Sequence, residues 1–214
     1  MFQEESSCAS QDSLSVVTTA LHEFAESLGA AVDARDHHTR LHSEEVAEMS
    51  RCLALRLGLS SGDAEVIHVA AHLHDVGKIG IPDAVLHKSG PLDEAEWQML
   101  RRHPAIGAAI VRPVRALRQC GIMGMILHHH ERFDGRGYPH GLSGRSIPRG
   151  ARIIAVADSV SAMLQKRPYR SALSFAEARA EIMRCSGTQF DPEVAEAFEK
   201  SAPLFQALLQ ELVA

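Results

Sequence analysis

Helical spacing of apolar residues recurs along most of this chain and constrains its fold more than any other feature. Within residues 14–34, Val17, Leu21, Phe24 and Leu28 follow one another at intervals of three and four, which places them on one face of a helix. Similar patterns predict further helices over 36–57, 63–74, 151–164, 174–185 and 191–212. Helix starts are expected at Pro91 and after Pro104, and a helix end near His130. No segment of useful length alternates as a strand would, so we expect an all-α fold.

A glycine-rich segment over residues 132–150, which also contains Pro139 and Pro148, is expected to form a loop between helices. A chain of 214 residues can bury a sizeable core and favours one domain with at most a small extension. We therefore expect a lead-in over residues 1–30, polar at first and then helical, and one folded domain over residues 31–214.

Composition excludes several classes of function. The net charge of −5 provides no general basic face for duplex nucleic acid or anionic lipid. No apolar run approaches membrane-spanning length, and residues 1–13 lack the apolar core of a signal peptide. Four cysteines are scattered without a CxxC pair, which fits reduced thiols: Cys8, Cys52, Cys120 and Cys185. These features predict a cytoplasmic protein without a membrane span.

The thirteen histidines fall in a few tight groups, and the group at His74 and Asp75 is the most informative. Imidazole and carboxylate together are the usual ligands of divalent first-row metals, and a carboxylate can bridge two ions. Lys78 lies about one turn beyond Asp75, where it can stabilise a phosphoryl oxygen. This arrangement predicts a metal-dependent hydrolase whose metals are held inside a helical bundle.

Histidine pairs four residues apart need a second explanation, because that spacing places both rings on one helix face. His38 and His42 form one such pair, and a pair of this kind more often lies at the surface or in the core than at a metal. His68 and His72 form another. We expect these two to pack, since His74 and Asp75 already account for the chemistry of that helix.

Three further sites carry polar residues that the metals could use. His129 and His130 are adjacent, and neighbouring side chains on a helix diverge by about 100°. They would therefore address different ions or lie at the end of a helix. Asp158 is an acid inside an apolar helical stretch, and a buried carboxylate needs partners such as a metal. His103, which precedes Pro104, could merely cap a helix.

Two separated segments resemble the motifs of the HD-GYP family, a branch of the HD-domain phosphohydrolases. They are His-Asp-Val-Gly-Lys at 74–78 and Glu-Arg-Phe-Asp-Gly-Arg-Gly-Tyr-Pro at 131–139. The likeness runs from about residue 33 to 198, and its shorter matches lie at 35–36, 39–40, 42–43, 79–82, 103–104 and 167–170. The resemblance implies an HD-domain bundle of about seven core helices with a glycine-rich GYP loop, so that residues 31–214 form the catalytic domain.

The resemblance also implies a set of site residues. The metal ligands fall on His42, His74, Asp75, His103, His129, His130 and Asp158, with Asp75 as the bridge. Relatives with three metals carry a glutamate where this chain has His38, so two or three divalent ions are implied. Substrate contacts fall on Lys78, Tyr138, Arg167 and Arg170, and Asp75 with Lys78 carry catalysis. The family usually has an aspartate at the position of Ser161, which predicts altered hydrogen bonding around the ligands.

The activity implied is hydrolysis of cyclic di-GMP to 5′-pGpG or GMP, which lowers the level of this second messenger. Arg167 and Arg170, a turn apart, would clamp the second phosphate through paired hydrogen bonds. Mixed histidine and aspartate ligation suits Fe, Mn, Ni or Zn, of which Fe or Mn is expected.

Alternatives remain open at this stage. The chain could hydrolyse another nucleotide, such as cyclic GMP-AMP or a nucleoside monophosphate. It could instead be a catalytically quiet module that binds a cyclic dinucleotide or docks a regulatory or GGDEF-type protein through Gly137, Tyr138 and Pro139. The complete ligand set favours an enzyme, and the loop favours a cyclic dinucleotide as its substrate. A homodimer also remains open.

Overall fold

The structure, a computed structural model, describes residues 5–36, 41–165 and 172–213, and the side chains in these ranges except those of 5–18 and 213. Helix accounts for 71% of it, and the described residues contain no strand. The expected all-α fold is confirmed. The α-helices are α1 (Glu5–Arg35), α2 (His42–Arg56), α3 (Ser61–His72), α4 (Asp83–Leu86), α5 (Glu94–Leu100), α6 (His103–Val111), α7 (Arg115–Gln119), α8 (Ile122–His128), α9 (Arg149–Leu164), α10 (Phe175–Arg184), α11 (Pro192–Lys200) and α12 (Ala202–Val213).

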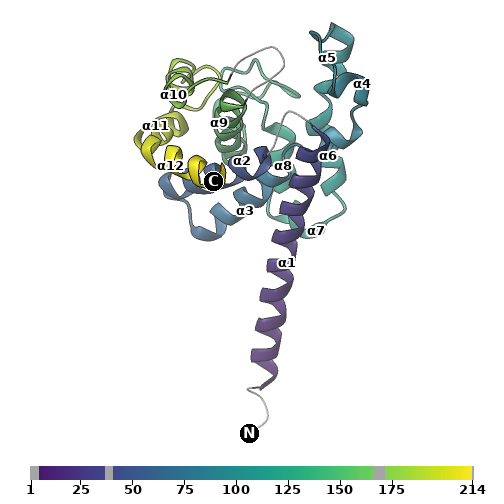
Figure 1. Cartoon of the computed structure of the whole chain (residues 1–214). Coiled ribbons are helices and arrows are strands. Elements are labelled where there is room, and N and C mark those ends of the chain that lie inside the picture. The colour runs from purple at the N-terminus through teal and green to yellow at the C-terminus, as the bar shows by residue number, and fades with distance from the viewer. Residues whose placement is uncertain (1–4, 37–40, 166–171, 214) are drawn as a thin grey trace.

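Helices α2, α3, α8 and α9 form the centre of the molecule (Figure 1). Helices α10, α11 and α12 cover one side, and α4, α5 and α6 lie on the other. The C-terminal part of α1 packs against α2 and α3, while its N-terminal part extends away from the body. Two short 3-10 helices, η1 (Val76–Gly80) and η2 (Gly144–Ser146), lie in the connections. In the part of the chain that the structure describes, no helix has the length and apolarity needed to cross a bilayer.

Small apolar residues allow α2 and α3 to approach closely. Ala47 and Ala54 of α2 and Ala70 of α3 are completely buried, as are the larger Leu53 and Ile153, the latter from α9. A fully buried leucine or isoleucine side chain stabilises the fold by about 1.5–3 kcal/mol. The shared core of these three helices therefore holds rigid the segments from which the polar site described below is built.

Capping explains several helix boundaries and corrects one prediction. The Ser60 hydroxyl accepts a hydrogen bond from the Asp63 backbone N–H at 3.1 Å, so Ser60 is the N-cap of α3. The predicted helix over 63–74 therefore starts earlier than expected, and Asp63 lies in its first turn, where an acid favours the helix. Asp93 and Glu96 form a capping box at α5. A helix start was expected at Pro91, and α5 begins at Glu94.

The second predicted helix begins later than expected. We placed its start near Asp36, but α2 begins at His42. Leu41 directly before it has a φ of 61°, in the left-handed region that breaks helical geometry. Helix α1 continues without a break across residue 30. The division of the chain into a lead-in and a catalytic domain at that residue stays a prediction.

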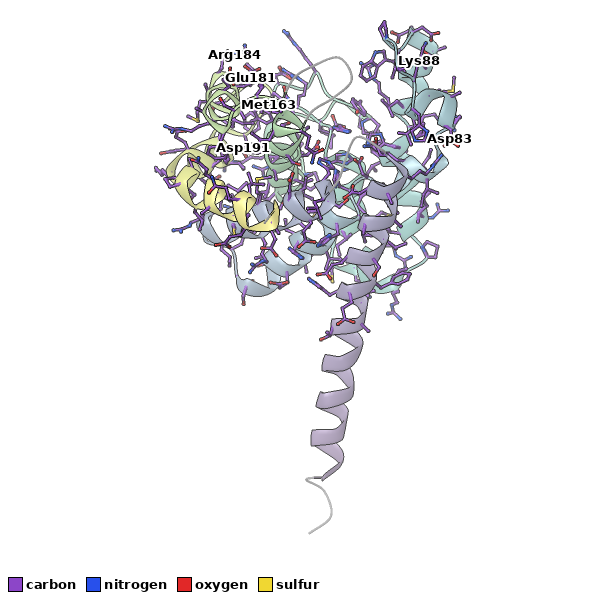
Figure 2. All side chains as sticks on the ribbon, viewed as in Figure 1. Asp83, Lys88, Met163, Glu181, Arg184 and Asp191 are labelled. Carbon is purple, nitrogen blue, oxygen red and sulfur yellow. The ribbon has the colours of Figure 1, made fainter. Side chains whose placement is uncertain are left out.

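Ion pairs fasten the outer helices to the centre. Arg152 of α9 pairs with Asp191, the N-cap of α11, and both side chains are largely buried. Arg35 at the end of α1 donates to the carbonyls of Lys78 and Ile81 and to Asp83, at 2.6, 2.7 and 2.8 Å. Figure 2 labels Asp83 and Asp191, which lie on opposite sides of the molecule. Arg35 thereby ties α1 to the segment that contains η1.

Candidate metal centre

Seven predicted ligand side chains converge at the centre of the bundle, although they come from five separate segments. Most of them lie at helix ends: at the start of α2 and of α6, and directly after α3 and α8. One lies within α9. The residues are His42, His74, Asp75, His103, His129, His130 and Asp158. The structure therefore brings together every predicted ligand that falls in its described residues.

Asp75 stands between two sets of histidines. Its Oδ1 lies 3.2 Å from Nε2 of His103. Its Oδ2 lies 3.4 Å from Nε2 of His74 and 3.9 Å from that of His42. Donor atoms of Asp75, His103, His129 and His130 lie within 4.8 Å of one another, and so do those of His42, His74 and Asp75. The two carboxylate oxygens thus face different histidines, as expected of a carboxylate that bridges two ions.

Backbone carbonyls orient the histidine rings. The Nδ1 of His74 lies 2.6 Å from the carbonyl of Ala71, and that of His129 lies 2.7 Å from the carbonyl of Ile126. His103 makes the same contact with the residue three before it, at 2.8 Å. Each acceptor lies in the last turn of a helix, where carbonyls lack an intrahelical partner. Because Nδ1 carries the hydrogen, the Nε2 lone pair faces the site.

These lone pairs fit a metal and little else. Nε2 of His74 is buried and has no hydrogen-bond partner among the described residues, which is costly for a polar atom. Nε2 of His103 and Nε2 of His129 lie 3.3 Å apart, and with both hydrogens on Nδ1 neither can donate to the other. A cation between such donors removes both costs. The residues present therefore fit divalent metal ions.

His129 and His130 are adjacent in the chain, and the structure shows how both rings can face one site. Helix α8 ends at His128, and His129 is its C-cap. The two rings lie with centroids 4.0 Å apart and contribute to one donor set. The sequence left open whether the two histidines address different ions or lie at the end of a helix, and the structure places them at a helix end. His128 lies outside the set, because its ring contacts the Gly124 carbonyl and His140 at 2.8 and 3.1 Å.

Ser161 links the first histidine to a buried acid. Its hydroxyl lies 2.8 Å from Nδ1 of His42 and donates to Oε2 of Glu45 at 2.5 Å. Nε2 of the same histidine lies 3.3 Å from Oδ1 of Asp158. A serine therefore orients this ligand where the family usually has an aspartate, and Glu45 of α2 supplies the carboxylate.

Opposite charges balance within the centre. Burial disfavours the charge of Asp75, but Lys78 and His74 hold the pKa of its carboxyl well below the usual range. Burial also opposes protonation of His74, yet the carboxylates of Asp75 and Asp158 raise its pKa to about 9. Burial and the neighbouring histidines lower the pKa of His130 to about 3. The carboxylates and His130 are thus in the states that bind metals, whereas a metal at His74 would have to displace the proton that the two carboxylates favour.

Lys78 reaches the centre from η1. Its Nζ lies 2.8 Å from Oδ2 of Asp75 and 2.8 Å from Oδ2 of Asp36. Although burial works against the charged amine, these two carboxylates raise its pKa above the ordinary value. The lysine therefore stays charged beside the carboxylate that faces both histidine sets.

The loop after α8 places Tyr138 against the centre. The Tyr138 ring lies 4.9 Å from that of His130. Glu131 holds the loop, because its carboxylate accepts the backbone N–H groups of His140 and Leu142 at 2.7 and 3.1 Å. Burial, followed by the charges of nearby acids, raises the pKa of Tyr138, so the phenol stays protonated.

Arg101 is a residue that the sequence did not indicate. Its guanidinium lies 5.4 Å from the ring centroid of Tyr138 and 5.8 Å from that of Trp97, within cation–π range. Arg101 follows α5 and belongs to no motif, so only the folding of α5 beside the loop reveals it. Three predicted site residues lie outside the described residues: His38, Arg167 and Arg170.

Comparison with known proteins agrees with the geometry. The family profile of the HD domain matches residues 26–194. A cyclic di-GMP phosphodiesterase of Thermotoga maritima is 43% identical over 181 residues, which are 84% of this chain and 49% of that protein. The 3'3'-cGAMP-specific phosphodiesterase 2 of Vibrio cholerae is 39% identical over 81% of this chain and 33% of its own length. The chain thus spans half or less of these relatives.

A solved structure shows the same fold. The crystal structure of a cyclic GMP-AMP specific phosphodiesterase of Vibrio cholerae superposes with a TM-score of 0.69 at 22% identity. The match covers 87% of this chain and 50% of that chain. The resemblance to the HD-GYP branch seen in the two sequence motifs is confirmed, and the chain belongs to the HD-domain family.

Proposed function

We propose that this chain is a metal-dependent phosphodiesterase that hydrolyses cyclic di-GMP to 5′-pGpG or GMP. The observation that carries the proposal is the position of Asp75 between two histidine sets, with one carboxylate oxygen toward each. Similarity to a protein named cyclic di-GMP phosphodiesterase over 84% of the chain supports the substrate. We assign the seven convergent residues as metal ligands and propose two ions, with Fe or Mn preferred over Ni or Zn. A third ion at His38 stays a prediction.

Bound divalent ions supply Lewis acidity: they make water more acidic and neutralise charge on a phosphoryl group. The protein residues do the positioning. Asp75 spans the two histidine sets and fixes their separation. Lys78, 2.8 Å from Asp75, offers an ammonium group where negative charge grows on the phosphoryl oxygens. Asp36 holds the other side of that ammonium, which keeps it oriented before substrate arrives.

The loop residues suit the rest of the substrate. Tyr138 presents its ring beside His130, and Arg101 lies over that ring. We propose that these two residues contact the nucleotide next to the scissile phosphate, since an aromatic ring and a guanidinium both stack on bases. Arg167 and Arg170 stay predicted as the clamp on the second phosphate.

A second candidate substrate is cyclic GMP-AMP. The observation in its favour is the 39% identity to a protein named 3'3'-cGAMP-specific phosphodiesterase. Both substrates carry the same pair of bridging phosphates, so the metal centre serves either, and the base contacts decide between them. A regulatory or GGDEF-type partner at the loop and a homodimer also stay predictions.

The test is turnover by the purified protein supplied with Mn²⁺ or Fe²⁺. Cyclic di-GMP and cyclic GMP-AMP are compared at equal concentration, and the products are resolved by chromatography. We expect faster hydrolysis of cyclic di-GMP. Asp75→Asn should abolish turnover and lower the bound metal while the helical circular dichroism is retained. Asp63→Asn, an exposed acid on α3, is the matched control and should remain active.

Two results would contradict the proposal. Metal-loaded protein that binds cyclic di-GMP without cleaving it would indicate a binding module. Full activity in Asp75→Asn would remove the bridging carboxylate from the mechanism.

A further inference from the structure

A second group of histidines and acids lies where α1 crosses α2 and α3. Each of these helices contributes one pair of residues four apart: His22 and Glu26 from α1, Glu44 and Glu48 from α2, and His68 and His72 from α3. Residues at that spacing share a helix face, so three helices direct six potential ligands toward their common contact. None of the six belongs to the centre at Asp75. The sequence alone predicted only that His68 and His72 pack.

The side chains meet at distances that suit coordination. One donor atom each of His22, Glu26 and His68 lie within 4.8 Å of one another. Nε2 of His22 lies 2.9 Å from Oε1 of Glu26. The rings of His22 and His68 are stacked with centroids 4.8 Å apart, so the partly exposed His22 ring has to rotate for both rings to face one ion. Nε2 of His72 adjoins the group, 3.1 Å from Nε2 of His68 and 3.8 Å from Oε2 of Glu44. Ligands of one tetrahedral zinc ion lie about 3.4 Å apart, given bonds of about 2.1 Å.

His68 carries the second, independent observation. Its side chain is only 3% exposed, and no described group meets its Nδ1 with full hydrogen-bond geometry, although the backbone of Ala47 and the carboxylate of Glu48 lie near enough to favour its protonated form. The contact with His72 uses Nε2 of both rings, so it leaves Nδ1 unsatisfied whichever ring donates. The nearest carboxylate, Oε1 of Glu48, is 3.8 Å away, which is too far for a hydrogen bond. Burial lowers the pKa of His68, so the ring is neutral and able to bind a metal.

The electrostatic balance favours a cation at this position. Glu48 is neutralised by Arg51 at 2.8 Å. The ion pairs described for Glu26 and Glu44 are instead with histidines, His22 and His72. A cavity of about 330 Å³ opens beside the group, and Glu26, Glu44 and His72 are among the residues that line it. An ion could therefore enter from solvent.

We propose that His22, Glu26 and His68 bind a further divalent cation at a site separate from the catalytic metals. His72 and Glu44 lie at the edge of this site that borders the cavity. Imidazole with carboxylate suits Zn²⁺ best among common ions. Its effect is structural. The ion joins α1 to α3, which pack against each other. It therefore fastens the N-terminal helix, whose first part extends away from the body (Figure 1), to the catalytic core.

The test counts zinc in protein stripped by a chelator and dialysed against micromolar Zn²⁺. His22→Gln and Glu26→Gln should each bind about one equivalent less per chain than the wild type. Both residues are partly exposed, so these substitutions leave the core intact. Glu65→Gln removes a similar exposed acid from α3, and this matched control should bind the wild-type number of ions.

Two further readings separate this site from the catalytic centre. With Mn²⁺ supplied, turnover of cyclic di-GMP should be the same in His22→Gln as in the wild type. Added Zn²⁺ should raise the melting temperature of Mn²⁺-loaded wild type but not that of His22→Gln. Equal zinc content and equal melting shifts in all four proteins would overturn the proposal, whatever the substrate of the enzyme proves to be.

Discussion

For a single residue at the metal centre, the position of the ring hydrogen decides what the side chain can bind. His74, His103 and His129 each direct Nδ1 to a backbone carbonyl. These contacts survive most substitutions, because the backbone supplies them. His42 differs, since its Nδ1 meets the hydroxyl of Ser161. The orientation of that ligand therefore depends on one side chain.

Ser161→Ala tests this dependence. The substitution removes the contact with His42 and leaves Glu45 without its hydroxyl donor. Loss of a residue that orients a ligand typically lowers metal affinity or activity by about 10–100-fold, and we expect a decrease of this size, measured by metal titration and turnover. Ser50 is equally buried but its hydroxyl has no partner among the described residues. Ser50→Ala should therefore leave both quantities unchanged, and equal effects of the two variants would refute the assignment.

Arg101→Ala tests the residue that only the structure revealed. The guanidinium lies over Tyr138 beside the centre, so its removal should raise the KM for cyclic di-GMP. A cation–π contact contributes about 0.5–2 kcal/mol, equivalent to a change of roughly 2- to 30-fold. The metal content should stay the same. Arg102→Ala removes the adjacent exposed arginine and should have little effect. An unchanged KM in Arg101→Ala would exclude this contact.

At the scale of elements, close backbone contact between η1 and α6 fixes the distance between the two histidine sets. A Cβ at Gly77 in η1 would lie 1.9 Å from the His103 carbonyl oxygen and 2.5 Å from the Gly107 N. Only glycine lets η1 approach α6 this closely. The approach sets the distance from Asp75, directly before η1, to His103 at the start of α6.

Gly77→Ala should therefore separate η1 from α6. We expect a loss of at least about 1–3 kcal/mol in the free energy of unfolding, the size of a steric overpacking effect, together with reduced metal binding. Denaturant titration measures the first and elemental analysis the second. A Cβ at Gly90 meets nothing within 4 Å, so Gly90→Ala should change stability by less than about 0.5 kcal/mol. Wild-type stability in Gly77→Ala would contradict the described packing.

The pair of Arg152 and Asp191 fixes α11 against α9. Both side chains are at least nine-tenths buried, and removal of one partner from a buried pair leaves an uncompensated charge that costs about 3–5 kcal/mol. Asp191→Asn, which retains a capping side chain, should lower the free energy of unfolding by this amount. Glu199→Gln disrupts an exposed pair with Arg179, and the loss should be much smaller. Similar losses in both variants would show that burial does not decide the effect.

For the whole molecule, the metals should link distant parts of the fold, because their ligands come from α2, α6, α9 and the ends of α3 and α8. Ligands that bind only the folded state stabilise it by mass action, by about 2.7 kcal/mol at a concentration 100 times Kd. Removal of metal by a chelator should therefore lower the melting temperature, and Mn²⁺ should restore it. Asp75→Asn should respond much less to either treatment. A melting temperature indifferent to metal would contradict a shared centre.

Much of this molecule could be predicted from the sequence. The all-α class follows from helical spacing, which depends on local geometry. The seven ligand positions followed from motifs at 74–78 and 131–139 and from the matches around them, and the structure brings these residues together. Errors arose at boundaries, where α2 starts at His42 rather than at Asp36. Helix ends depend on individual caps and turns, and these signals are weak.

The sequence by itself determined which residues are able to bind metal, because ligand chemistry belongs to the side chain. Tertiary structure alone decided which of them share a site. His128, His129 and His130 are consecutive, yet only the last two join the set around Asp75, because α8 ends at His128. His68 and His72 look like core residues until α1 and α2 bring His22, Glu26 and Glu44 beside them. The physical reason is that coordination requires several donors within a few ångströms, and packing of distant helices sets that distance.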